Sequence, residues 1–208
     1  MSFLTGGQGV ATLLLAHGAG APMDHPVMEA LAQALMAQNL RVIRFEFAYM
    51  AQRREGGPRR PPPKIYLLCD EFRRAVDDLA CAGPLFIGGK SMGGRVASMV
   101  ADDLARTGQV QGALCYGYPF HPQGKPDRLR TAHLMDIAAP VLICHGTRDP
   151  FGSPEEIAGY GLPPQVQLHW LDDGDHDFKP RKRVTGQEQG DLLAEAAQAS
   201  ARWIAAQL

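Results

Sequence analysis

The chain has 208 residues, a formal net charge of −1, 45% hydrophobic side chains and 21% charged ones. This length suits one domain, residues 1–208, with a substantial core. The near-neutral charge gives no electrostatic basis for binding nucleic acid or an anionic membrane, and no run approaches the roughly 20 apolar residues that cross a bilayer.

Cysteine usage and the N-terminal residues favour a cytoplasmic protein. The four cysteines form no Cys-x-x-Cys pair, and Cys115 and Cys144 lie in apolar runs typical of buried strands. Buried free thiols favour a reducing compartment. The apolar run Leu13–Ala16 is too short for the core of a secretion signal, and no charged segment precedes it.

Apolar runs and turn residues predict alternating strands and helices along the chain. The predicted strands are Val10–Ala16, Arg41–Phe47, Leu85–Gly88, Gly112–Tyr116, Pro140–His145 and Val166–Leu171. The predicted helices are His25–Gln38, Ile65–Ala82, Ser91–Arg106, a short one near Glu155–Tyr160, and Asp191–Gln207. This alternation predicts an α/β fold, with a mostly parallel six-stranded sheet and helices on both of its faces.

Three further features follow from this pattern. Only nine residues precede Val10, which leaves little room for earlier strands, and the charges within Arg41–Phe47 favour the edge of the sheet. The segment Ala48–Lys64 contains three consecutive prolines and is expected to be extended. The segment Gly117–Asp136, at about 20 residues, is too short for a helical lid, so the site is expected to be open and shallow.

The most informative motif is Gly89-Lys90-Ser91-Met92-Gly93-Gly94, which follows an apolar strand and opens a helix. A Gly-x-Ser-x-Gly turn between a strand and a helix is the nucleophile elbow of a serine hydrolase. The tight turn is expected to strain the backbone of Ser91, and side chains at Gly89 and Gly93 would clash. The start of the helix directs its N–H groups at the reacting centre.

An acid and a histidine follow in the chain order that this elbow predicts. Asp149 lies on the loop after the strand Pro140–His145, and His176 lies on the loop after Val166–Leu171. The carboxyl ends of parallel strands share one edge of a sheet, so these loops should meet Ser91 there. His176 would take the proton of Ser91, and Asp149 would orient the imidazole. The alternative acids are Asp172, Asp173, Asp175 and Asp177.

An oxyanion hole needs two backbone N–H donors. One is expected from Met92, directly after the nucleophile, and the other from the loop after the first predicted strand, at Ala19 with Gly18 as the alternative. Small residues let this loop approach a substrate oxygen. His17 is expected to form hydrogen bonds that shape the loop instead of acting on substrate.

Six stretches of the chain carry a resemblance to a known family: His17–Asp24, Arg44–Phe47, Gly89–Arg95, Gly117–Pro122, Gly146–Gly152 and Asp173–His176. With them, the chain resembles the α/β-hydrolase superfamily from about Val10 to the C-terminus. More narrowly, it is similar to the bacterial branch of a small group shared with testis-expressed proteins and chromatin-complex subunits, and distantly to dienelactone hydrolases. The resemblance implies a serine-hydrolase fold, but no particular substrate.

Side chains on the loops at the catalytic edge are candidates for substrate contacts. The aromatic candidates are Tyr49, Tyr118, Phe120 and Phe151, and Lys90 lies beside the nucleophile. A substrate bearing a carboxylate or phosphate would suit the basic residues of these loops, although solvated charges compensated by nearby acids are the alternative. The basic residues are Arg53, Arg54, Arg59, Arg60, Lys64, Lys125, Arg130, Lys179, Arg181, Lys182 and Arg183.

No cofactor is expected. The histidines lack metal-ligand spacing, and the glycines of Gly83–Ser91 surround a strand instead of following it, unlike a phosphate-binding loop. We interpret the chain as a lidless serine hydrolase that cleaves a small ester, thioester or lactone through a Ser91 acyl-enzyme. A peptidase of the same fold and a non-catalytic interaction subunit are the alternatives, and the oligomeric state is left open.

Overall fold

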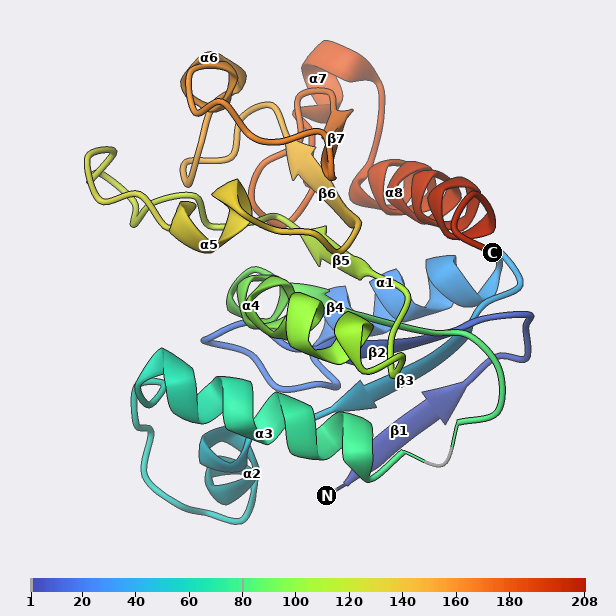
Figure 1. The fold of residues 1–208 in the computed structure, drawn as a ribbon. Coiled ribbons are helices and arrows are strands. Elements are labelled where there is room, and N and C mark those ends of the chain that lie inside the picture. The colour runs from blue at the N-terminus through green and yellow to red at the C-terminus, as the bar shows by residue number, and fades with distance from the viewer. Residues whose placement is uncertain (1, 80) are drawn as a thin grey trace.

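A twisted, mostly parallel sheet runs through the centre of the molecule in the computed structural model (Figure 1). The structure describes residues 2–79 and 81–208. Two positions covered by the predictions lie outside the described residues: Met1, in the predicted domain, and Ala80, in the predicted domain and the predicted helix Ile65–Ala82. Over the described residues the sheet has seven strands in the order β1-β3-β2-β4-β5-β6-β7. They are β1 (Phe3–Gly6), β2 (Thr12–Ala16), β3 (Arg41–Phe45), β4 (Leu85–Lys90), β5 (Ala113–Tyr116), β6 (Val141–Gly146) and β7 (Val166–Leu171).

Helices cover both faces of the sheet, as predicted. The helices α3 and α4 pack on one face, and α1 and α8 pack on the other (Figure 1). The helices are α1 (Pro26–Met36), α2 (Ala48–Arg54), α3 (Ile65–Asp77), α4 (Met92–Arg106), α5 (Ala132–Met135), α6 (Pro154–Ala158), α7 (Lys182–Thr185) and α8 (Gln189–Ala205). Among the described residues, every helix is too short or too polar to serve as a membrane span.

The alternation of side chains along β2 explains why both faces need a helical cover. Leu13 and Leu15 point into the core beneath α1 and α8, whereas Leu14 and Ala16 point into the core beneath α3 and α4. All four side chains are fully buried. A strand that is apolar on both faces is typical of a parallel sheet between two helical layers.

All six predicted strands are present, as β2 to β7, but the predicted number of strands and the predicted edge position of Arg41–Phe47 are wrong. Strand β1 pairs antiparallel with β3, with Phe3 opposite Phe45, so β3 lies inside the sheet and β1 forms the edge. The charge of Arg44 is accommodated in this interior strand because its guanidinium pairs with the Glu29 carboxylate at 2.6 Å. A four-residue strand carries too short an apolar pattern to stand out in the sequence.

The two segments predicted to lack regular structure do so only in part. The prediction that Ala48–Lys64 lacks helix is wrong for its first part, because Ala48–Arg54 forms α2; residues 57–64, with the proline run, are irregular as expected. The segment Gly117–Asp136 contains only the one-turn helix α5 within its described residues, so the expected absence of a lid is confirmed. The short helix α7 was not predicted.

The glycines of the turn after β4 are required by close packing of the backbone. A Cβ atom on Gly89 would lie 2.4 Å from the carbonyl carbon of Gly93 and 2.7 Å from the carbonyl oxygen of Ala16. Backbone atoms at those positions cannot move away without displacing β2 or α4. We therefore expect Gly89→Ala to lower the free energy of unfolding by about 1–3 kcal/mol or more, measured by urea denaturation.

Gly190→Ala is the matched control for this substitution. Gly190 lies in the first turn of α8, and a Cβ atom there would meet nothing within 4 Å. This change should leave stability unchanged or raise it by up to about 1 kcal/mol, through helix propensity. A Gly89→Ala protein as stable as the wild type would contradict the packing argument.

Candidate active site

Ser91 lies at a sharp turn between β4 and α4. It is the N-cap residue of α4 and has φ of 52° and ψ of −115°, a conformation that costs a non-glycine residue about 1–3 kcal/mol. A Cβ atom on Gly93 would lie 2.5 Å from the Ala16 carbonyl oxygen, so glycine lets α4 start directly against the loop after β2. The backbone strain and the glycine contacts expected for this turn are both present.

Three side chains from separate loops form one hydrogen-bonded chain at the carboxyl edge of the sheet. His176 Nε2 lies 2.9 Å from Ser91 Oγ, and His176 Nδ1 lies 2.8 Å from Asp149 Oδ2. Because a carboxylate only accepts, Nδ1 carries the imidazole proton and Nε2 is free to accept from the serine hydroxyl. The structure thus brings together the serine, histidine and acid that the sequence predicted.

Asp149 is buried and is held in its ionised form by its partners. Its Oδ1 accepts a hydrogen bond from the Phe151 N–H at 2.9 Å. Burial by itself raises the pKa of Asp149, but the hydrogen bond from His176, the electrostatic influence of His145 and His176, and the hydrogen bond from the Phe151 N–H together outweigh it, so the pKa lies below its ordinary value. An ionised carboxylate at this position can orient the imidazole and stabilise it when it is protonated.

His145 supports this carboxylate from below and was not singled out in the sequence. It is fully buried, its Nε2 lies 3.7 Å from Asp149 Oδ2, and the same nitrogen lies 3.0 Å from the Gly152 carbonyl oxygen, to which it donates. Burial lowers the pKa of His145, so it is neutral at physiological pH. In the sequence, the only indication that His145 lies near the site is its position one residue before the end of the strand that precedes Asp149.

The alternative acids are either exposed or bound to other groups. Asp172 is exposed, and Asp175 accepts hydrogen bonds from the backbone N–H groups of Asp177 and Lys179 at 2.9 Å. Asp177 pairs with Lys90 at 3.1 Å. Asp149, which lies on a different loop from His176, is the predicted acid whose carboxylate the structure places in hydrogen-bonding contact with the imidazole.

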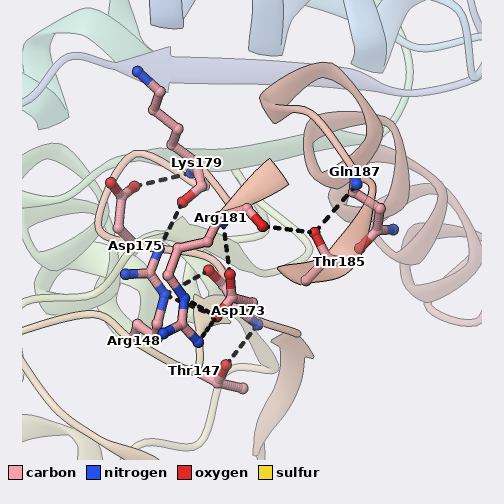
Figure 2. Close-up of polar contacts among 8 residues, drawn as sticks. All are labelled: Thr147, Arg148, Asp173, Asp175, Lys179, Arg181, Thr185 and Gln187. Atoms are coloured by element: carbon pink, nitrogen blue, oxygen red, sulfur yellow. Dashed lines mark hydrogen bonds and ion pairs between the residues drawn. The ribbon is translucent and has the colours of Figure 1, made fainter. Parts of the chain in front are cut away.

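Asp173 organises the loop that carries His176, as Figure 2 shows. Its backbone N–H donates to Thr147 Oγ1 at 2.8 Å, and its carboxylate pairs with Arg148 at 3.0 Å and with the Arg181 guanidinium. The Arg181 backbone N–H also donates to this carboxylate, at 2.6 Å. Hydrogen bonds from Arg181 are the main reason that the pKa of Asp173 falls to about 2. These contacts join the loop after β6 to the loop after β7.

Two hollows adjoin Ser91, one on each side. The histidine-side hollow, about 360 Å³, is bordered by Gly18–Ala21, Lys90, His176 and Asp177. The arginine-side hollow, about 440 Å³, is bordered by Met92, Arg95, Arg130, Phe151 and two prolines, Pro62 and Pro63. Ala19 and Ser91 border both. A substrate with its carbonyl at Ser91 could place one group in each hollow.

The side chain of Lys90 forms part of the wall beside the histidine. It is only 6% exposed, and its ammonium lies 5.9 Å from the centre of the Phe178 ring. Burial lowers the pKa of Lys90, and the Asp177 carboxylate acts in the opposite direction. Its charge is thus already partnered within the protein.

Only some of the predicted substrate contacts lie where the sequence put them. Lys90 borders the histidine-side hollow and Phe151 the arginine-side hollow. The prediction for Tyr118 and Phe120 is wrong, because both side chains are fully buried in the core beneath α4. Tyr49 borders neither hollow; its hydroxyl donates to the Ala19 carbonyl oxygen at 3.0 Å and so supports the loop after β2.

Most of the basic residues that the sequence places on loops at the catalytic edge do not border the two hollows at Ser91. Arg54 pairs with Asp24 at 2.7 Å and with Glu46 at 2.9 Å, and Arg181 is bound to Asp173. Apart from Lys90, Arg130 is the one basic residue named from the sequence that borders either of the two hollows at Ser91. Arg95, which also borders that hollow, was not singled out because a lone arginine on a helix carries no sequence signal.

Of the two predicted oxyanion donors, Ala19 borders both hollows and Met92 borders the arginine-side hollow. Met92 is the first residue of α4, where backbone N–H groups have no partner within the helix. Ala19 belongs to the loop after β2. The structure confirms that His17 shapes this loop: the Phe47 N–H donates to its Nε2 at 3.1 Å, which leaves Nδ1 to donate to the Gly18 carbonyl oxygen at 2.7 Å. Burial lowers the pKa of His17 and keeps it neutral.

Among residues 2–79 and 81–208, no three His, Cys, Asp or Glu side chains lie together in a way that could hold a metal ion.

Comparison with known proteins gives the same fold. Residues 9–205 match the model of a family described as an alpha/beta hydrolase domain. A lidless α/β serine hydrolase from Xanthomonas campestris superposes with a TM-score of 0.68 at 19% identity, covering 94% of this chain and 83% of that one. A dienelactone hydrolase from Anabaena variabilis gives 0.68 at 23% identity, covering 95% and 86%. An esterase domain from Rhodothermus marinus gives 0.65 at 16% identity, covering 98% of both chains.

The depressed pKa of Asp173 predicts a specific dependence of stability on pH. A carboxyl whose pKa is about 2 in the folded protein, against an ordinary value of 3.8, stabilises the fold above about pH 4 and loses that effect as the pH falls toward 2. Asp173→Asn should lower the melting temperature at neutral pH and flatten its decline between about pH 4 and 2. Its kcat/KM should fall by about tenfold or more, because His176 is less well held.

Asp172→Asn is the control, since it is exposed and adjacent in sequence. It should match the wild type in both melting profile and activity. Identical pH profiles for Asp173→Asn and the wild type would show that the cluster in Figure 2 does not stabilise the fold.

Proposed function

The chain belongs to the alpha/beta hydrolase domain family, and on that premise we propose that it is a serine hydrolase that cleaves a small ester, thioester or lactone. The observation that carries the proposal is the chain of hydrogen bonds from Ser91 through His176 to Asp149, with distances of 2.9 and 2.8 Å. Those distances are within reach of direct proton transfer.

The proposed reaction begins with attack of Ser91 Oγ on the substrate carbonyl carbon. His176 Nε2 removes the hydroxyl proton as the bond forms, and the carbonyl oxygen becomes negatively charged. The imidazolium then donates this proton to the leaving oxygen or sulfur, which departs and leaves an acyl-enzyme on Ser91. Water, deprotonated by the same nitrogen, releases the acid and restores the serine.

The negative oxygen of the intermediate would be bound by the backbone N–H groups of Met92 and Ala19. Met92 begins α4, so its N–H is supported by the partial positive charge at a helix N-terminus. The tight packing of Gly93 against the loop after β2 brings the Ala19 segment next to the nucleophile. Both donors are main-chain groups, which need no reorganisation during the reaction.

The absence of a lid limits the size of substrate that the site can enclose. The two hollows at Ser91, of about 360 and 440 Å³, suit small groups, whereas a long acyl chain would extend into solvent and gain little from burial. We infer a small-molecule substrate for this reason.

The motifs around Ser91 and Asp149 favour one branch of the family, the bacterial branch of the group shared with testis-expressed proteins. The buried free thiols of Cys115 and Cys144 suit a cytoplasmic enzyme.

The first test of the proposal is the identity of the nucleophile. Ser91→Ala should reduce turnover of p-nitrophenyl butyrate by about 10³-fold or more, and it should abolish labelling by a fluorophosphonate probe. His176→Ala should lose a similar amount, and the double variant little more, because the two residues act as one unit. Additive losses would show that another nucleophile acts, whereas a wild-type protein that the probe does not label would favour a non-catalytic role for the fold.

The second test concerns the acid. Asp149→Asn replaces the acceptor of the His176 Nδ1–H by an amide that can present a donor there, so the imidazole takes the wrong tautomer. We expect kcat at pH 7 to fall by about 10²-fold or more with the circular-dichroism spectrum unchanged. Asp172→Asn, on the same edge of the sheet, should remain fully active. If Asp149→Asn were mild and one of the acids near His176 were essential, the assignment would be wrong.

A further inference from the structure

The arginine-side hollow combines apolar walls with two guanidinium groups. Pro62, Pro63 and Ile65 form one side of it, and Arg95 and Arg130 also border it. Arg95 lies in the first turns of α4 and Arg130 lies just before α5; both are half-buried. The hollow ends at Ser91, so a group bound by the arginines would belong to the molecule that is attacked.

Neither arginine has a counter-ion within the part of the chain that the structure describes. No carboxylate lies within ion-pair distance of either guanidinium, and Arg95 Nε is buried without any hydrogen-bond partner. Burial and the neighbouring charge of Arg95 lower the pKa of Arg130. Two cations brought together away from water are unfavourable unless an anion joins them.

The groups packed behind the arginines are neutral. The Tyr118 hydroxyl donates to the Arg130 carbonyl oxygen at 2.7 Å, and His133 Nε2 lies 2.9 Å from Ser98 Oγ. Burial, together with the charge of Arg95, lowers the pKa of His133 to about 4, so it is uncharged at neutral pH. The first acid along α4 after Arg95 is Asp102, two turns away. Its carboxylate accepts hydrogen bonds from the backbone N–H groups of Ala138 and Ala139, which follow α5.

We propose that Arg95 and Arg130 bind a carboxylate carried by the acyl group of the substrate. The preferred substrates are then monoesters or monothioesters of short dicarboxylic acids. The fork of N–H donors on a guanidinium matches the two oxygens of a carboxylate, and the proline and isoleucine walls can bury the methylene groups between the carboxylate and the ester. This inference rests on the proposed acyl-enzyme at Ser91.

The position of the histidine decides which half of the ester bears the carboxylate. The leaving oxygen must lie near His176 Nε2 to receive its proton, and His176 borders the histidine-side hollow but not the arginine-side one. The leaving group therefore occupies the histidine-side hollow, and the acyl group extends toward Arg95 and Arg130. Hydrolysis releases a neutral alcohol or thiol and a free dicarboxylate.

The test compares monobenzyl succinate and monobenzyl glutarate with benzyl 4-amino-4-oxobutanoate, in which a neutral amide replaces the succinate carboxylate. Release of benzyl alcohol is measured by chromatography. We expect kcat/KM to favour a charged ester by about 10- to 100-fold, as hydrogen bonds to a charged group contribute. Arg95→Gln and Arg130→Gln should each bring this ratio close to one, and Arg130→Lys should retain part of it.

Arg128→Gln is the matched control, because Arg128 is exposed on the same loop and borders neither hollow. It should keep both the basal rate and the ratio. Melting curves and fluorophosphonate labelling establish that each arginine variant is folded and retains a reactive Ser91.

Two outcomes separate this inference from the proposed function. Equal rates on charged and neutral esters, unchanged in the arginine variants, would overturn the carboxylate site and leave the serine hydrolase intact. If no ester is cleaved, calorimetry with glutarate on the Ser91→Ala protein decides: binding that Arg130→Gln removes supports the site, and no binding overturns it. A wild-type protein that the probe does not label would instead count against the proposed function.

Discussion

The close approach of three backbone segments around Gly89 and Gly93 is the constraint on which the site depends. The end of β4, the start of α4 and the loop after β2 pack so tightly that a Cβ atom on either glycine would overlap main-chain atoms. The same contact holds Ser91 at a positive φ angle and places the loop of Ala19 next to it. One packing arrangement thus sets the nucleophile and the proposed donors together.

Backbone packing and side-chain hydrogen bonds together assemble the other half of the site. The loops after β6 and β7 pack directly against each other, since a Cβ atom on Gly146 would lie 2.2 Å from the Gly174 carbonyl oxygen. The cluster around Asp173 adds side-chain hydrogen bonds between the same two loops (Figure 2). Arg148 and Arg181 join the two loops, and His145 lies beneath Asp149. Close backbone packing thus positions all three loops, and a polar network adds to it at the loops of the histidine and the acid.

Charge is distributed unevenly around a chain that is nearly neutral. Arg54 and Lys90 are each paired with carboxylates of the protein, so their positive charge is compensated before any ligand binds. Arg95 and Arg130 differ because neither forms an ion pair with a carboxylate of residues 2–79 and 81–208, and Tyr118 and His133, which pack nearby, are neutral. The net charge of the chain therefore says little about the electrostatics of this site. What matters there is which cationic side chains lack a carboxylate partner.

The sequence by itself determined the α/β alternation, the strained turn at Ser91 and the order of acid and histidine, because each is recorded in local periodicity or in spacing relative to strands. Tertiary structure alone decided the rest. The edge strand β1 forms through pairing with β3, which a four-residue pattern cannot encode. Tyr118 is buried although it sits on an edge loop. Arg95 and Arg130 meet only because α4 and the segment before α5 pack together, since long-range packing brings together side chains that are far apart in the sequence.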